Sequence, residues 1–177
     1  MPTITLSPNS IIASGTQGVS PTGDEEELND DNIILLSDGE SSTGVIFVEN
    51  NSILSFGVED HSLSSGDNVT SIIVQCDLIS GTKTTLTLKQ SINPEDSIGQ
   101  FTTVSTYVGG PANGIEFSPL GHTDHSKINA LRLSLQSSTG DHFMSEIRIV
   151  VTYTSPAPGV ITLTEGLIIL KEGVITL

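Results

Sequence analysis

A cluster of His and Asp residues lies at residues 121–125, where the sequence reads GHTDH. Two imidazoles and a carboxylate suit Zn²⁺ when they converge on one point. Positions three apart on a strand face opposite sides, so His122 and His125 would converge only in a loop. A loop is expected after Pro119, but the sequence offers no identifiable further ligand. We therefore predict a polar surface loop here, with no bound metal.

A second group of oxygen ligands lies at residues 24–31, in the acidic run DEEELNDD. Carboxylate oxygens are ligands that Ca²⁺ prefers. The run lacks the Asp-x-Asp-x-Asp-Gly pattern and the downstream Glu of an EF-hand loop. A solvated loop is the interpretation that fits best, and we predict no cofactor for the chain.

Catalytic residue types are present without a pattern typical of an active site. The four histidines, His61, His122, His125 and His142, all lie in expected loops. The sequence has no Gly-x-Ser-x-Gly elbow and no Gly-rich phosphate loop followed by a helix. No pair of carboxylates is marked out for glycoside hydrolysis. We therefore predict that the protein is not an enzyme.

Charge excludes several classes of partner. Six Lys and Arg face 21 Asp and Glu, which gives a formal net charge of −15. Nucleic-acid binding requires a basic surface, and an anionic membrane would repel this chain. No apolar run reaches the ~18 residues of a membrane span, and the start MPTITL is unlike a secretory signal. We expect a protein made in a cytoplasm, with neither nucleic acid nor membrane as partner.

Short segments with a period of two dominate the middle of the chain. Apolar residues alternate with polar ones at residues 70–80, 83–90, 130–136 and 146–154, and further strands are expected at 33–36, 45–49, 53–59, 101–108 and 115–118. One apolar face per strand is typical of half-buried antiparallel strands. Cys76 falls on such a face and is predicted to be a buried, inert thiol. The pattern predicts an all-β fold, an antiparallel β-sandwich resembling a jelly roll.

Three regions are expected along the chain. Residues 1–31 form an extended N-terminal arm with the acidic loop, and residues 3–6 are a possible short strand in it. Residues 32–155 form the β-sandwich. Residues 156–177 begin with the spacer Pro156-Ala157-Pro158, which cannot continue a β-ladder. Short C-terminal β-strands follow the spacer.

The C-terminal run GVITLTEGLIILKEGVITL repeats every seven residues with Gly in first place. A terminus this rich in apolar residues would be an aggregation hazard if it were exposed to water. We therefore expect it to be covered. Either the run folds back as edge strands of its own sandwich, or it pairs with a neighbouring subunit. We favour the neighbour, because the proline spacer carries the run outward. The predicted assembly interface comprises Val160, Ile161, Leu163, Leu167, Ile168, Ile169, Leu170, Val174, Ile175 and Leu177.

Carbohydrate binding is the main competing function for a sandwich of this kind. Sugar sites usually need an aromatic platform beside convergent polar groups. The chain has no Trp and two Tyr. Tyr153 is predicted to point inward, which leaves Tyr107 as the candidate platform.

The segments 29–34, 69–76, 85–90, 128–135 and 145–151 read NDDNII, VTSIIVQC, TLTLKQ, INALRLSL and SEIRIVV. In this order they resemble the small jelly-roll modules of tailed-bacteriophage virion proteins. The resemblance covers residues 29–154 and does not extend to the arm or the C-terminal run. It implies a component of the virion surface.

Capsid decoration (cement) proteins and tail or fibre proteins both use such modules. We expect a decoration protein that stabilises the shell through strand pairing between subunits. Its expected partners are further copies of itself, as a trimer or dimer, and virion proteins such as the major capsid protein. The alternative is a tail or fibre adhesin that binds a glycan on the host surface.

Overall fold

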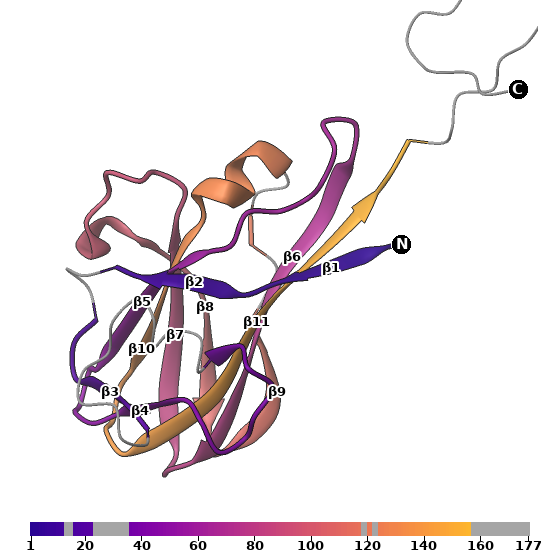
Figure 1. Ribbon diagram of the computed structural model, residues 1–177. Coiled ribbons are helices and arrows are strands. Elements are labelled where there is room, and N and C mark those ends of the chain that lie inside the picture. The colour runs from indigo at the N-terminus through magenta and orange to yellow at the C-terminus, as the bar shows by residue number, and fades with distance from the viewer. Residues whose placement is uncertain (13–15, 23–35, 118–119, 122–123, 157–177) are drawn as a thin grey trace, which may run out of the picture.

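The computed structural model describes residues 1–12, 16–22, 36–117, 120–121 and 124–156. Two antiparallel sheets pack face to face around one core (Figure 1). Sheet A has the order β3 (Val19–Pro21), β4 (Val45–Phe47), β11 (His142–Thr154), β6 (Asn68–Ser80) and β9 (Ala112–Phe117), with β1 (Thr3–Leu6) also paired to β11. Sheet B has the order β2 (Pro8–Ile11), β5 (Ile53–Val58), β10 (Arg132–Ser137), β7 (Thr84–Ser91) and β8 (Thr102–Gly109). The predicted antiparallel β-sandwich is confirmed.

The pairing between the strands from β4 to β11 follows one rule. β7 pairs with β8, β6 with β9, β5 with β10 and β4 with β11. These are the pairs of one long antiparallel ribbon folded back at the connection between β7 and β8. Successive pairs along the ribbon alternate between the two sheets. Residues distant in sequence therefore become neighbours, with Phe47 opposite His142.

The apolar faces predicted from the alternation form the core. On β6, Ile72, Val74, Cys76 and Leu78 are fully buried. The inward residues of the other three alternating segments are buried as well: Leu86, Leu88, Leu131, Leu133, Leu135, Ile147, Ile149 and Val151. Cys76 is buried as predicted. Burial raises the pKa of its thiol to about 12, which favours the protonated form.

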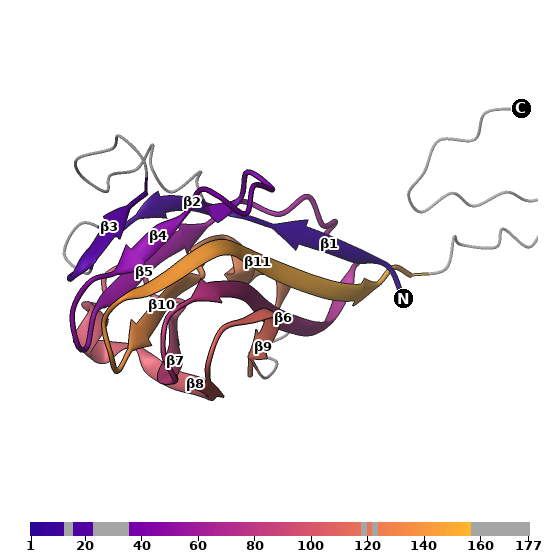
Figure 2. The same ribbon diagram turned by 90° about the horizontal axis from the view of Figure 1, so that it is seen from below.

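The described part of residues 1–31 belongs to both sheets. The predicted strand at residues 3–6 is confirmed as β1, in which Thr3 lies opposite Thr152 of β11. After Ser7 the chain crosses to sheet B as β2, and Val19 begins β3 in sheet A. Figure 2 shows β1 and β11 side by side and antiparallel, so that β1 begins at the end of the sandwich where β11 finishes. The expected boundary between residues 31 and 32, and residues 33–35 of an expected strand, lie outside the described residues.

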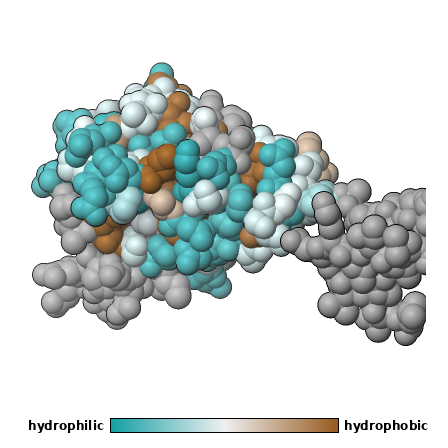
Figure 3. All heavy atoms as spheres, turned by 90° about the horizontal axis from the view of Figure 1, so that it is seen from above, coloured by the Kyte–Doolittle hydropathy of each residue, from teal (hydrophilic) through white to brown (hydrophobic). Residues whose placement is uncertain are grey.

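Two short 3₁₀ helices, η2 (Ile98–Gln100) and η3 (His125–Ala130), lie in loops between strands. On the face seen in Figure 3, hydrophobic residues form separate small patches among hydrophilic ones. Large exposed hydrophobic side chains in the described part of the chain are Met1, Val48, Ile79, Ile92 and Val108.

Candidate functional site

The ten residues of the predicted assembly interface, from Val160 to Leu177, lie outside the described residues. The acidic run at 24–31 and His122 lie outside them too. The structure does describe the chain up to Pro156, and so it shows the place from which the C-terminal run departs. We call this place the exit end; it comprises the ends of β1, β6 and β11 and the loop at residues 59–67.

Hydrogen bonds hold the three strand ends of the exit end together. The Tyr153 N–H donates to the Pro2 carbonyl at 3.1 Å, so β11 and the N-terminus stay paired to their last residues. The Thr70 hydroxyl donates to the Thr152 carbonyl at 3.1 Å and joins β6 to β11. Tyr153 is half-buried and packs against the core, as predicted. Three hydrogen-bonded strands therefore form the end of the sandwich at which β11 finishes.

One side chain fixes the chain just beyond β11. The Ser155 hydroxyl donates to Asp67 Oδ1 at 2.6 Å, and the Ser64 N–H donates to Asp67 Oδ2 at 2.8 Å. These two donors, with Ser155 the stronger, hold the pKa of Asp67 below its ordinary value. Pro156 lies against Gly66, where an added Cβ would come within 3.3 Å of the proline ring. The turn at residues 64–67 thus holds Ser155 and Pro156.

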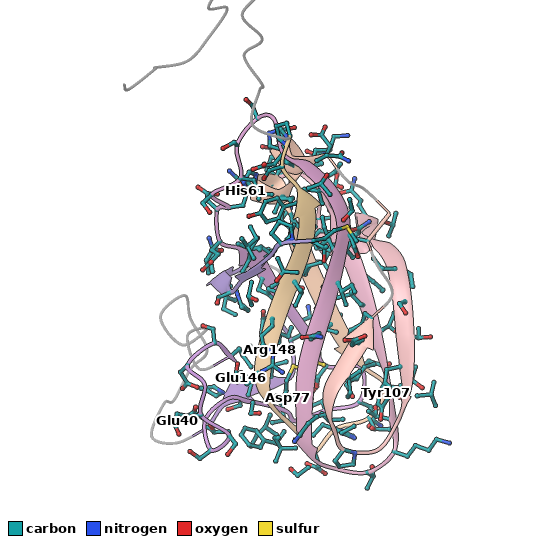
Figure 4. All side chains as sticks on the ribbon, turned by 90° about the vertical axis from the view of Figure 1, so that its right-hand side faces the viewer. Glu40, His61, Asp77, Tyr107, Glu146 and Arg148 are labelled. Carbon is teal, nitrogen blue, oxygen red and sulfur yellow. The ribbon has the colours of Figure 1, made fainter. Side chains whose placement is uncertain are left out.

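His61 links the loop at residues 59–67 to η3. Its Nε2 donates to the His125 carbonyl at 2.6 Å, and its Nδ1 accepts the Leu63 N–H at 3.0 Å. Both ring nitrogens are therefore bonded, which fixes the orientation of the imidazole ring. The His61 N–H also donates to Asn129 Oδ1 at 3.0 Å. In Figure 4, His61 lies at the end of the molecule where β11 ends.

The described part of the GHTDH segment has a structural role. Asp124 caps η3 by accepting the Ser126 N–H and hydroxyl at 3.0 and 2.7 Å. The Ser126 hydroxyl first, and then its N–H, keep the pKa of Asp124 below its ordinary value. Among the residues that the structure describes, no three His, Cys, Asp or Glu side chains gather to hold a metal ion.

Charged groups meet on the outer face of sheet A (Figure 4). Arg148 of β11 pairs with Asp77 of β6 at 2.9 Å. Glu146, only 8% exposed, accepts the Gly39 N–H at 2.8 Å. Burial raises the pKa of Glu146, although the Gly39 N–H opposes the change. Asp77 lies on the strand adjacent to Arg148, so their ion pair links β6 to β11 on the outer face of sheet A.

A shallow polar groove of about 270 Å³ opens beside β2 and β10. Its lining includes the side chains of Asn9, Asp60, Asn129 and Arg132. Arg132 also donates from Nη1 to the Asp96 carbonyl at 2.7 Å, so it is partly used in holding that loop. The remaining amides and carboxylate are groups that can hydrogen-bond to a sugar.

Tyr107, the candidate aromatic platform for a sugar site, makes its contacts within its own turn and with the core. The Tyr107 hydroxyl donates to the Gly110 carbonyl at 2.8 Å, within its own turn, and the ring packs against the core. Figure 4 shows Tyr107 on the opposite side of the molecule from Glu40. Tyr107 does not line the polar groove, so the groove lacks the expected platform.

Sequence reasoning missed the clamp at Asp67 and the roles of His61 and Arg132. The turn signal at residues 64–67 marked Asp67 only as a turn residue. No local sequence pattern indicates that the partner of Asp67 is Ser155, which is distant from it in the sequence.

Comparison with known proteins does not assign the chain to a family. No protein-family model matches the sequence, and a search of curated proteins finds no similar chain. No helix in the described ranges is both long and apolar enough to cross a membrane.

Proposed function

We propose that this protein is a non-enzymatic structural component of a phage virion, a capsid decoration protein that stabilises the shell through strand pairing between subunits. The observation that supports the proposal best is the exit end. Pro2 and Tyr153 are hydrogen-bonded neighbours there, and the Ser155–Asp67 bond fixes the residue that follows β11. A strand offered to a neighbour from a fixed base loses less conformational freedom on pairing.

We also propose that the sandwich is a jelly roll. The four ribbon pairs, from β7 with β8 out to β4 with β11, support this connectivity. The resemblance of residues 29–154 to phage virion modules supports the virion as the location. Fold alone does not define function, so the proposal depends on the termini as well.

The proposed partners are further copies of the chain, in a dimer or trimer, and the major capsid protein. A net charge of −15 disfavours DNA and anionic lipid, which leaves protein surfaces as the partners of an apolar terminus. The proposal includes no catalytic step. In support, His61 and His142 both direct a ring nitrogen to a backbone carbonyl, at 2.6 and 2.7 Å.

Deletion of residues 159–177 tests the proposed function. We expect the truncated protein to keep its folded core, because the buried core residues come from the described strands up to β11. We expect it to lose self-association and to occupy few sites on purified particles. Unchanged assembly together with unchanged particle occupancy would contradict the proposal. The copy number of the full chain per particle is an independent measurement, since a shell component is present in hundreds of copies and a tail component in few.

A second candidate is a tail or fibre adhesin that binds host glycans, and the polar groove with Asn9, Asp60 and Asn129 favours it. A glycan array with the isolated protein tests this function. Saturable binding that Asp60→Ala abolishes would favour the adhesin over the decoration protein.

A further inference from the structure

We propose that a cavity at the end of β7 binds one neutral sugar residue, with the Gln90 amide and the Asp96 carboxylate as its main polar contacts. The cavity has a volume of about 330 Å³, and its described lining shares no residue with the polar groove beside β2 and β10. The inference goes beyond the decoration function, because it adds a ligand and requires neither the C-terminal run nor a second copy of the chain.

Gln90 breaks the apolar alternation of β7. Leu86 and Leu88 are fully buried, and Gln90 occupies the next position on the same face of the strand. It lies opposite Leu133 of β10, which is fully buried as well, so this position faces the core. The Gln90 Oε1 atom is buried and has no hydrogen-bond partner in the described structure. Packing does not explain such an oxygen at a core position, whereas a ligand that donates a hydrogen bond does.

The Gln90 amide can reach a ligand because its side chain lines the cavity. The terminal torsion of a glutamine side chain has broad energy minima, so the amide can turn its oxygen toward a donor at low cost. Gln90 therefore offers an acceptor at the inner wall of the cavity.

Asp96 provides the second acceptor. The Ser91 hydroxyl donates to Asp96 Oδ2 at 2.6 Å, and the Asn93 Nδ2 donates to Asp96 Oδ1 at 2.9 Å. Each oxygen of a carboxylate can accept a further hydrogen bond. The Asp96 side chain is thus held in a fixed position on the cavity wall and can still accept from a ligand.

Arg132 fixes the loop that carries Asp96. Its Nη1 donates to the carbonyls of Asn93, Pro94 and Asp96, at 3.3, 3.0 and 2.7 Å. Its guanidinium carbon lies over the ring of Phe101, 5.3 Å from the centroid. A loop that is already held in place loses less conformational freedom when a ligand binds.

The mixture of donors and acceptors favours a hydroxylated ligand. Gln100 also lines the cavity, and its Oε1 accepts the N–H and the hydroxyl of Ser97 at 2.9 and 2.8 Å, which leaves its Nε2 as a donor. A hydroxyl both donates and accepts, so neighbouring hydroxyls of a sugar match Gln100 together with the two acceptors. An ammonium ion would match the acceptors alone. An anion would be repelled by Asp96 and by the net charge of −15.

Ile92 supplies the apolar contact. Its side chain is 36% exposed and lines the cavity, where it can pack against the C–H face of a sugar ring. No aromatic ring belongs to the lining that the structure describes, so we expect weak binding, with a Kd on the order of 1 mM. The volume lies at the lower end of the roughly 300–1,000 Å³ range of ligand pockets, which suits a single sugar residue.

An NMR titration of the full-length ¹⁵N-labelled protein tests the site. The probes are the methyl glycosides of glucose, galactose, mannose, rhamnose and N-acetylglucosamine, with methylammonium as the cationic comparison. We expect at least one glycoside to shift the side-chain NH₂ signals of Gln90 and Gln100 and the amide signals of residues 92–97 in a saturable way. The signals of Asp60 and Asn129, which line the other groove, should stay unchanged.

Three variants assign the binding to this cavity. Gln90→Leu continues the apolar alternation of β7 but cannot accept from the ligand, so we expect a folded protein whose Kd is raised at least about tenfold. Gln136→Leu is the matched control, because Gln136 bonds to Lys89 and does not line the cavity, and it should leave the Kd unchanged. Ile92→Ser changes a partly exposed side chain and should weaken binding several-fold with the fold intact.

The absence of a saturable shift with every glycoside would overturn the proposal. So would an affinity that Gln90→Leu leaves unchanged or, if that variant does not fold, one that Ile92→Ser leaves unchanged. A larger response to methylammonium than to every glycoside would overturn the choice of a sugar. Shifts centred on Asp60 and Asn129 would overturn the site and move the sugar to the other groove. The deletion of residues 159–177 does not alter this cavity, so the decoration function stands or falls separately.

Discussion

Ser155 and Asp67 are joined by a 2.6 Å hydrogen bond between the Ser155 hydroxyl and Asp67 Oδ1, across the ends of β11 and the turn before β6. With the contact of Pro156 against Gly66, the bond attaches the last described residues of the chain to the sandwich. Strand pairing ends at Thr154, opposite Asn68, so Ser155 carries the attachment one residue further.

Ser155→Ala should make the region around Asp67 less resistant to acid. A carboxyl whose pKa is lowered in the folded state adds stability above its unfolded pKa, and this stability is lost as the pH falls through the folded pKa. Without the Ser155 hydroxyl, the pKa of Asp67 should rise toward its ordinary value. An NMR titration of the Asp67 carboxyl measures this change. Ser65→Ala, in the same turn, is the control, and an equal change there would refute the assignment.

Cys76 should not react with thiol reagents in the folded protein. The thiol is fully buried on β6, and its pKa of about 12 leaves almost no thiolate at pH 8. We expect labelling by a maleimide only at the rate of unfolding, and complete labelling in denaturant. Rapid labelling in native buffer would show that the two sheets separate locally at Cys76.

Ser134→Ala should stabilise the protein. Ser134 is 1% exposed, and its hydroxyl has no hydrogen-bond partner among the described residues. Removing a buried polar group without a partner relieves a desolvation cost of about 1 kcal/mol or more. Thermal or urea unfolding measures the gain. Leu133→Ala, the adjacent change on β10, should instead lose about 2–5 kcal/mol, because it leaves a cavity in the core.

Glu146→Gln should stabilise the protein at pH 7 and have no effect near pH 3. The folded-state pKa of Glu146 is raised, so the wild type has its full contribution below the unfolded pKa and loses it as the pH rises through the folded pKa. Glutamine keeps an acceptor for the Gly39 N–H without the buried charge. We expect a gain below about 1 kcal/mol in urea unfolding at pH 7. A variant less stable than wild type at pH 7 would mean that the charge interaction with Arg148 outweighs burial.

The strands could be predicted because each buries one face. Alternation at Ile72, Val74, Cys76 and Leu78 encodes burial directly, and the structure buries all four. β2 escaped prediction because its sequence, PNSI, has no alternation and depends on pairing with β5 for its conformation.

The candidate site could be predicted only in part. The proline spacer is visible in the sequence, but its clamp joins Ser155 to Asp67, which lie far apart in the chain. The hydrogen bond from the Tyr107 hydroxyl to the Gly110 carbonyl likewise depends on local packing, which the amino-acid composition does not predict. The assembly residues from Val160 to Leu177 remain a prediction.

The folded-back ribbon also constrains when the protein can fold. The β7–β8 pair closes the shortest loop, while β4 and β5 pair with β11 and β10, near the other end of the described chain. Closing a loop costs more entropy as the loop lengthens, and sheets built from distant strands fold slowly. During synthesis, β4 and β5 leave the ribosome long before their partners exist. The sandwich must therefore close after translation of β11, and β7–β8 is the first of the four ribbon pairs whose two strands have both been synthesised.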